Sequence, residues 1–128
     1  ERVQEEIVQK ATTEEALTIM ENILQSIPDL DGVFTTGDIF AIGIVSALQA
    51  NGYAPGEVKV TSIDGTNNAL DLIKNGYLHT TAAQLPRQLG IEGVKNALSY
   101  LKGEPFEKWM ELECKEINAE TMEGYVGF

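Results

Sequence analysis

The chain has 128 residues, of which 43% are hydrophobic and 23% charged, and this balance is ordinary for a soluble globular protein. Its formal net charge of -11 argues against a nucleic-acid partner, because affinity for a phosphate backbone depends on Lys and Arg side chains. The same charge disfavours an anionic membrane surface. A chain of 128 residues is long enough for one domain with a core, so we expect a single domain over residues 1–128. No apolar run approaches the length that crosses a bilayer, so we expect no direct membrane insertion.

Metal and disulfide chemistry have little support in the sequence. Cys114 is the one cysteine, which excludes a disulfide within the chain and a thiolate metal site. His79 is the one histidine, and a lone histidine in a strand is more often structural than a metal ligand. We therefore expect no metal and no cofactor. Residues 1–6 lack a basic-then-apolar leader and look like the end of a helix, which suggests a fragment or processed product.

The first part of the chain alternates short apolar runs with helical periodicity. Residues 7–10 predict a short strand. Residues 13–26 predict a helix with one buried face, because Thr12 and Glu15 have the spacing of a capping box and apolar residues follow at helical intervals. Residues 33–36 predict a second strand, short and suited to burial.

A helix that is apolar on almost every side is predicted over residues 39–49. Asp38 is a natural N-cap for it, and Gly43 allows close packing. Such a helix must be covered by the sheet on one side and by something else on the other, and we expect a partner lobe or subunit there. Residues 58–64 predict the next strand, which carries Asp64 at its C-terminal tip.

The same alternation continues to the end of the chain. A short helix begins at Asn67 or Asn68 and stops before Gly76, and the later elements are a strand over 78–84, a helix over 87–102 and an edge or crossing strand over 108–117. Strict alternation of strands and helices predicts an α/β fold: a doubly wound, mostly parallel sheet with helices on both faces.

Polar residues stand at the ends of three predicted strands. They are Thr36-Gly37-Asp38, Asp64-Gly65-Thr66 and Gln84. In an open α/β sheet the carboxyl ends of the strands form one edge, and ligands bind in the crevice outside it. Asp64 can there accept hydrogen bonds from a polyol, coordinate a metal or act as a nucleophile. It can also simply cap a helix, and the local pattern leaves both readings open.

Three stretches together resemble a known family. They are Val-Phe-Thr-Thr-Gly-Asp-Ile-Phe-Ala-Ile-Gly over residues 33–43, Val-Thr-Ser-Ile-Asp-Gly-Thr over 60–66, and the run from Asn75 to Gly90 that contains Ala-Gln-Leu-Pro. These stretches are similar to the C-terminal half of periplasmic sugar-binding proteins of the ribose-binding type, which have the type I periplasmic-binding-protein fold. LacI-type repressors share the same lobe in their effector domains. The resemblance covers roughly residues 11–117.

In that family two doubly wound lobes close on a sugar, and the chain crosses between them three times. The resemblance implies that this chain is an incomplete C-terminal lobe and that residues 86–102 are an inter-lobe crossing helix. It implies the solute-binding component of a sugar ABC transport system, periplasmic or extracellular, lipid-anchored or secreted as a precursor, with the ABC transporter membrane subunits as partners. Alone, such a chain should bind a small-molecule sugar weakly or not at all. The missing N-terminal lobe, or another copy of the chain, would complete it.

The resemblance also implies roles for particular residues. Asp64 matches the family's sugar-binding aspartate in the FDGT element, and Gln84 matches the glutamine of the AQLP element, so both would hydrogen-bond ring hydroxyls. Asp38 matches the aspartate of the NDxMALG element, while Gly37 replaces the asparagine before it. Ala11 stands where an aromatic residue often stacks on the sugar. These two departures leave a roomier or different ligand open.

Other functions have less support in the sequence. A LacI-type effector domain, which would be cytoplasmic, requires an N-terminal DNA-binding headpiece, and the Ala-Gln-Leu-Pro-Arg-Gln-Leu-Gly run is closer to transport proteins. The phosphatases with an Asp-x-Asp-Gly-Thr motif need a nucleophile where Ser62 stands, and phosphoacceptor domains need acids near Ala11. No glycine-rich phosphate loop is present. We therefore expect no enzyme; a non-binding assembly fragment is the remaining alternative.

Overall fold

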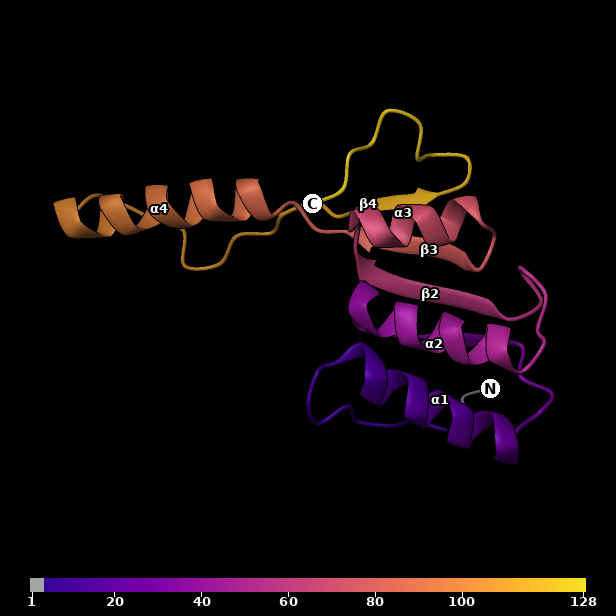
Figure 1. Cartoon of the computed structure of the whole chain (residues 1–128). Coiled ribbons are helices and arrows are strands. Elements are labelled where there is room, and N and C mark those ends of the chain that lie inside the picture. Colours follow the sequence, from indigo (N-terminus) through magenta and orange to yellow (C-terminus); the bar gives the residue numbers. More distant parts are fainter. Residues whose placement is uncertain (1–3) are drawn as a thin grey trace. The chain divides into compact units, whose positions relative to one another are not determined.

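The structure, a computed structural model, describes residues 4–128 and divides into two compact units (Figure 1). The sheet unit comprises the chain up to Ala83 together with Glu116–Phe128, and the helix unit comprises Gln84–Lys115. The helix predicted over residues 86–102 lies in the helix unit. Among the described residues, no helix combines the length and the apolar character that crossing a membrane requires.

Helix α1 (Thr13–Ser26) has the predicted bounds, and its capping box forms. The Thr12 hydroxyl accepts a hydrogen bond from Glu15 N at 3.2 Å. The strand predicted over residues 7–10 is wrong, because the carboxylate of Glu15 accepts the amides of Gln9 and Lys10 at 3.1 and 2.6 Å and occupies the donors that a neighbouring strand would need. Residues 4–8 have no regular structure, and residues 1–3 of the predicted helix end lie outside the described residues.

Four strands form the sheet in the order β1-β2-β3-β4. Strand β1 (Gly32–Phe34) is parallel to β2 (Lys59–Asp64), which is parallel to β3 (Leu78–Ala83), and β4 (Lys115–Asn118) runs opposite to β3 (Figure 1). The predicted α/β class with a mostly parallel sheet is confirmed. The strand predicted over 108–117 is wrong for residues 108–114, which are irregular and lie in the helix unit, where the described residues offer no sheet to pair with.

Helices α2 (Asp38–Ala50) and α3 (Asn67–Lys74) pack on the sheet and on each other. Their contacts, together with the sequential strand order, place both on the same face. The second cover that the apolar α2 needs comes from α1 of the same chain, not from a partner lobe or subunit as predicted. The largest fully buried apolar side chains come from α1, α2, β2 and β3, and they are Met20, Leu48, Val45, Val60 and Leu78. The first turns of α2 and α3 are thereby fixed beside the tips of the strands.

Helix α4 (Pro86–Lys102) of the helix unit contains no buried residue. It begins with Pro86 at the position where a missing N–H costs nothing, and it ends at Gly103, whose φ of 70° suits a left-handed C-cap. Within the helix unit, Asn96 Nδ2 donates to Glu107 O at 3.0 Å. The apolar residues of the predicted helical stripe are exposed: Leu89, Ile91, Val94, Leu98 and Leu101. The stripe exists as predicted, but the described residues leave it uncovered.

Candidate ligand-binding site

The tips of the parallel strands meet at one edge, as predicted. Asp64 pairs in register with Ala83, so Gln84 directly follows the residue beside Asp64. Thr35, just after β1, donates its amide to Thr61 O of β2 at 2.9 Å, and α2 begins three residues later at Asp38. Gln84 is half-buried and is the first residue of the helix unit. The predicted residues Gly37, Asp38 and Asp64 are therefore brought together within the sheet unit.

Asp38 is the most buried acidic side chain of this edge, with 1% of its surface exposed. Its Oδ1 accepts hydrogen bonds from the hydroxyls of Ser62 on β2 and Thr81 on β3, the latter at 2.8 Å. Its Oδ2 accepts from Gly65 N at 2.9 Å, Thr66 N at 2.7 Å and Thr66 Oγ1 at 2.9 Å. One carboxylate thus joins α2 to two strands and to the turn before α3. We call these five hydrogen bonds of Asp38 the Asp38 brace. Hydrogen bonds to a carboxylate are stronger than neutral ones, so the brace is stiff.

The prediction that Asp38 is the N-cap of α2 is wrong by one residue. Gly37 is the N-cap and makes no side-chain cap, whereas Asp38 is the first helical residue. The physical reason is the set of donors beneath it: the hydroxyls of Ser62 and Thr81 draw the carboxylate inward, away from the amides of its own helix. Both carboxylate oxygens of Asp38 are already bonded inside the protein.

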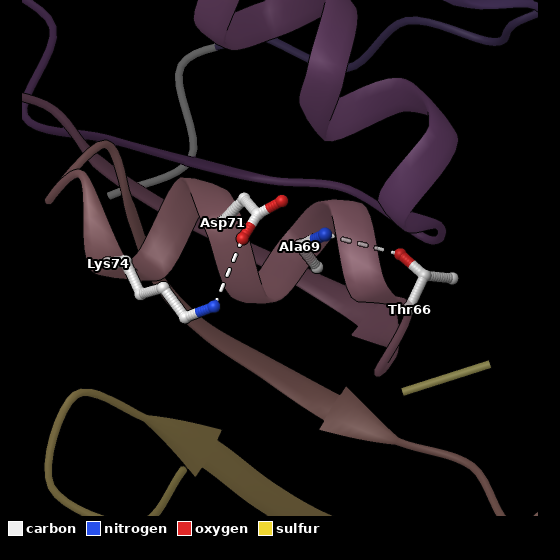
Figure 2. A network of polar contacts seen from close by, with 4 residues as sticks. All are labelled: Thr66, Ala69, Asp71 and Lys74. Carbon is white, nitrogen blue, oxygen red and sulfur yellow. Dashed lines mark hydrogen bonds and ion pairs between the residues drawn. The ribbon is translucent and has the colours of Figure 1, made fainter. Parts of the chain in front are cut away.

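Asp64 is half-buried at the end of β2, and its side chain lies beside the first turn of α2. Its Oδ2 accepts the amide of Asp38 at 3.3 Å, so the capping alternative is realised on α2 and not on the helix that follows Asp64. That helix, α3, is capped by Thr66, whose Oγ1 accepts Ala69 N at 3.3 Å; Figure 2 shows this cap and the exposed Lys74–Asp71 ion pair further along. Negative charge at a helix N-terminus is favourable. Asp64, at the end of β2, bonds to the start of α2, and Asp38, in α2, bonds to the residues just before α3.

The backbone at Asp64 is strained. Its φ is +127°, in a region that residues with a side chain rarely occupy, and the next residue, Gly65, has φ +85°. Conformations of this kind cost on the order of 1–3 kcal/mol and persist only where the surroundings over-determine them. The Asp38 brace, which holds both amides after Asp64, supplies that constraint.

Gly37 borders the carboxylate of Asp64. A β-carbon built on Gly37 would lie 3.4 Å from Asp64 Oδ2 and 3.5 Å from the ring of Phe40, which is ordinary contact distance. A methyl group would therefore fit at this position beside Asp64. Ala11, the other departure noted in the sequence, has φ +50° and is exposed in the loop before α1.

The C-terminal tail (residues 119–128) contributes to this edge, which sequence reasoning missed. Tyr125 donates its hydroxyl to Gly65 O at 2.9 Å, and Asn67 N donates to Phe128 O at 3.4 Å. Burial, and then the negative charge of Asp38, raise the pKa of Tyr125 above its usual 10.0. The phenol therefore stays protonated, and able to donate, to a higher pH than an ordinary tyrosine. No periodic pattern in the tail signals this contact, because Tyr125 is a single tyrosine in the glycine-containing run Gly-Tyr-Val-Gly.

We expect the free energy of unfolding to fall at alkaline pH through Tyr125. A folded-state pKa above 10.0 means that its contribution is full below pH 10.0 and is lost as pH rises through the raised value. The measurement is urea unfolding at a series of pH values from about 9 to 11, for the wild type and Tyr125→Phe. The wild type should lose stability more steeply above pH 10.0, and identical slopes would contradict the expectation.

The part of the chain that the structure describes contains no group of three His, Cys, Asp or Glu side chains arranged to hold a metal ion. At this edge the amides of Asp38, Gly65 and Thr66 already donate within the protein. The carboxylate of Asp64 is an acceptor, and the side-chain amide of Gln84 is chemically able both to donate and to accept.

Comparison with known proteins decides the family. Residues 1–105 match the family described as periplasmic binding protein domain. The chain belongs to this family. It is 39% identical to the ribose import binding protein RbsB of Salmonella typhimurium over 101 residues, which are 79% of this chain and 33% of that protein. It is 32% identical over 80 residues to the D-allose-binding periplasmic protein of Escherichia coli K12, covering 62% of this chain and 25% of that protein.

Solved structures of periplasmic binding proteins have the same fold. An ABC transporter solute-binding protein from Actinobacillus succinogenes with bound D-allose superposes with a TM-score of 0.82 at 29% identity, over 89% of this chain and 40% of that one. One from Agrobacterium vitis bound with α-D-tagatopyranose gives 0.88 at 24% identity, over 96% of this chain and 41% of that one. The periplasmic-binding-protein chain described here spans about a third of the length of the curated relatives it matches.

Proposed function

We propose that the chain is part of the solute-binding component of a sugar ABC transport system, and that Asp64 binds a monosaccharide at the C-terminal edge of the sheet. The observation that carries the proposal is the conformation of Asp64: a half-buried carboxylate on a strained residue with φ +127°, fixed by a buried hydrogen-bond brace. Strain of this kind clusters at ligand sites, where it holds a functional side chain ready.

The chemistry of the edge supports a sugar. A carboxylate accepts strong hydrogen bonds from ring hydroxyls, and the amide of Gln84 can donate and accept. Gln84 follows the residue that pairs with Asp64. Because Gly37 has no side chain, it places no side-chain atom beside the carboxylate of Asp64, where a β-carbon would be at contact distance. Asp38 takes part as a support beneath the site, since its own oxygens accept bonds within the protein. This is a binding function and not a catalytic one, in keeping with relatives that are binding proteins.

The proposed site is incomplete without further protein. The chain spans about a third of its relatives' length, and the apolar residues of α4 are exposed. We place these residues against the other lobe of a two-lobed binding protein, or against another copy of the chain, outside the cytoplasm and in reach of the ABC transporter membrane subunits. Native mass spectrometry of the purified chain tests this: a companion polypeptide or dimer is expected, and a monomer that retains a sugar adduct contradicts it.

Asp64→Asn is expected to weaken sugar binding about tenfold and leave stability nearly unchanged. Asparagine keeps the size of the side chain and tolerates positive φ, but it replaces charge-assisted hydrogen bonds by neutral ones, a difference of about 1.4 kcal/mol. The measurement is a titration of the chain, in the assembly that native mass spectrometry identifies, with D-ribose and, separately, D-allose at millimolar concentrations. Binding is followed by the amide chemical shifts of Asp64 and Gly65.

The matched control is Asp71→Asn, a change of the same charge at an exposed residue of α3 that pairs with Lys74. It should leave the titration unaltered. Shifts at Asp64 and Gly65 that persist unchanged in Asp64→Asn would remove the proposed site. An absence of any shift with either sugar in the assembly that native mass spectrometry identifies would also remove it.

A further inference from the structure

The C-terminal tail packs against the turn that carries Asp64, although it is distant in sequence. The tail, residues 119–128, belongs to the sheet unit and lies beyond residues 1–105, which match the family. Besides the bonds from Tyr125 and to Phe128, the tail approaches closely at Gly127. A β-carbon there would lie 2.5 Å from Asn67 N and 2.6 Å from Thr66 C, so the backbones are in direct contact.

The peptide groups around Gly65 are held from two sides. On the inner side, Asp38 Oδ2 accepts the amide of Gly65 at 2.9 Å. On the outer side, Tyr125 donates to the carbonyl of Gly65 at 2.9 Å. Gly65 itself fits between Tyr125 and Ala83, since a β-carbon on it would lie 2.5 Å from the Tyr125 hydroxyl and from Ala83 Cβ. With its amide and its carbonyl both bound, this residue has little freedom to rotate.

We propose that Tyr125 is a positioning residue for the ligand site, which acts by fixing the Gly65 peptide so that Asp64 keeps its strained conformation. The proposal rests on the function proposed above. A strained residue relaxes unless its neighbours are fixed, and the turn after Asp64 is fixed by one internal brace and one external one. Asp38 holds the amides of Gly65 and Thr66, and Thr81 Oγ1 also accepts the Gly65 amide, but the carbonyl of Gly65 is held by the tail. Without Tyr125, the turn gains a rotational freedom that changes the direction of the Asp64 carboxylate.

A purely structural role for Tyr125 is the alternative to exclude. Tyr125 is partly buried and packs against the hydrophobic core, so its loss can affect stability without affecting the site. The chain offers a matched tyrosine, Tyr53, which is also partly buried against the core and donates its hydroxyl to a backbone carbonyl, Pro28 O, at 2.7 Å. Tyr53 lies in the loop after α2, away from the strand tips.

The experiment compares the wild type, Tyr125→Phe and Tyr53→Phe in the complete chain, each in the assembly that native mass spectrometry identifies. Three quantities are measured for each: the hydrogen-exchange rates of the Gly65 and Thr66 amides, the melting temperature, and the affinity for D-ribose by amide chemical shifts. We expect Tyr125→Phe to raise exchange at Gly65 and Thr66 about tenfold, and to weaken D-ribose binding about three- to tenfold, with a melting temperature close to that of Tyr53→Phe. Tyr53→Phe should leave exchange and binding at wild-type values.

A second variant, Gly127→Ala, tests the same contact without touching the tyrosine. Its β-carbon cannot fit against Asn67 and Thr66, so the tail must move and exchange at Gly65 should rise as in Tyr125→Phe. Gly93→Ala is its control, because nothing lies within 4 Å of a β-carbon at that position. Unchanged exchange at Gly65 in both tail variants, or an equal rise throughout the sheet unit, overturns the positioning role.

The outcomes separate this proposal from the one on which it rests. Faster exchange at Gly65 in Tyr125→Phe, with no D-ribose response in any protein, means that the tail positions the turn and that the proposed sugar site is wrong. Equal D-ribose affinity in the wild type and Tyr125→Phe, with unchanged exchange, means that the sugar site stands and the positioning role fails.

Discussion

Replacing Asp38 by alanine is expected to lower the free energy of unfolding by about 3–5 kcal/mol. The change removes the acceptor of five hydrogen bonds at a side chain that is 1% exposed. The hydroxyls of Ser62 and Thr81 are in buried residues and lose a partner, and the amide of Gly65 keeps only its longer bond to Thr81 Oγ1 at 3.2 Å. Each buried donor left without an acceptor costs about 1–3 kcal/mol. Urea unfolding followed by circular dichroism gives the difference.

Asp38→Asn separates the loss of charge from the loss of the acceptor. Its carbonyl can keep the amides of Gly65 and Thr66, and its NH₂ can donate to the hydroxyls of Ser62 and Thr81, which can turn to accept. We expect a loss of only about 1–2 kcal/mol for this variant. The exposed Asp71→Ala should stay within about 0.5 kcal/mol of the wild type. A loss at Asp38→Ala no greater than that at Asp71→Ala would mean that the brace contributes nothing to stability.

Local signals in the sequence predicted the elements well where both ends of an element had a chemical marker. Helix α1 was predicted over its observed residues, because the capping box at Thr12 and Glu15 fixes its start and Pro28 follows its end. The predicted bounds of β2 and β3 each differ from the observed bounds by one residue at one end. The strands predicted over residues 7–10 and 108–114 are wrong. A short apolar pattern in the sequence does not show whether a neighbouring strand is present to form the hydrogen bonds of a sheet.

The site could be predicted only as a set of residues at one edge. Resemblance to the family named Gly37, Asp38 and Asp64 together, and the structure brings these three into contact. The inward turn of Asp38 could not be predicted, because it depends on hydroxyls from β2 and β3 that meet only in the folded sheet. Tyr125 was missed for the same reason: its partner, Gly65, is 60 positions away in the chain.

Gly43→Ala is expected to lower the free energy of unfolding by about 2–3 kcal/mol, because it forces α1 away from α2. A β-carbon on Gly43 would lie 2.8 Å from Leu17 N and closer still to Thr13 O, and these are backbone atoms that cannot rotate aside. The gain of about 1 kcal/mol that alanine normally brings to a helix interior offsets part of the cost. Urea unfolding of the purified variant measures the net effect.

Gly93→Ala is the matched control, a glycine-to-alanine change inside α4 where a β-carbon meets nothing within 4 Å. It should stabilise its helix slightly or leave stability unchanged. The same comparison bears on the ligand edge. Gly37 and Asp38 form the start of α2, and Asp64 is bonded to that start, so a displaced α2 should also shift the amide resonances of Asp64 and Gly65. If Gly43→Ala is as stable as Gly93→Ala, the prediction is wrong. The close contact between α1 and α2 at Gly43 would then not determine the position of α2, or of Asp38 at its start.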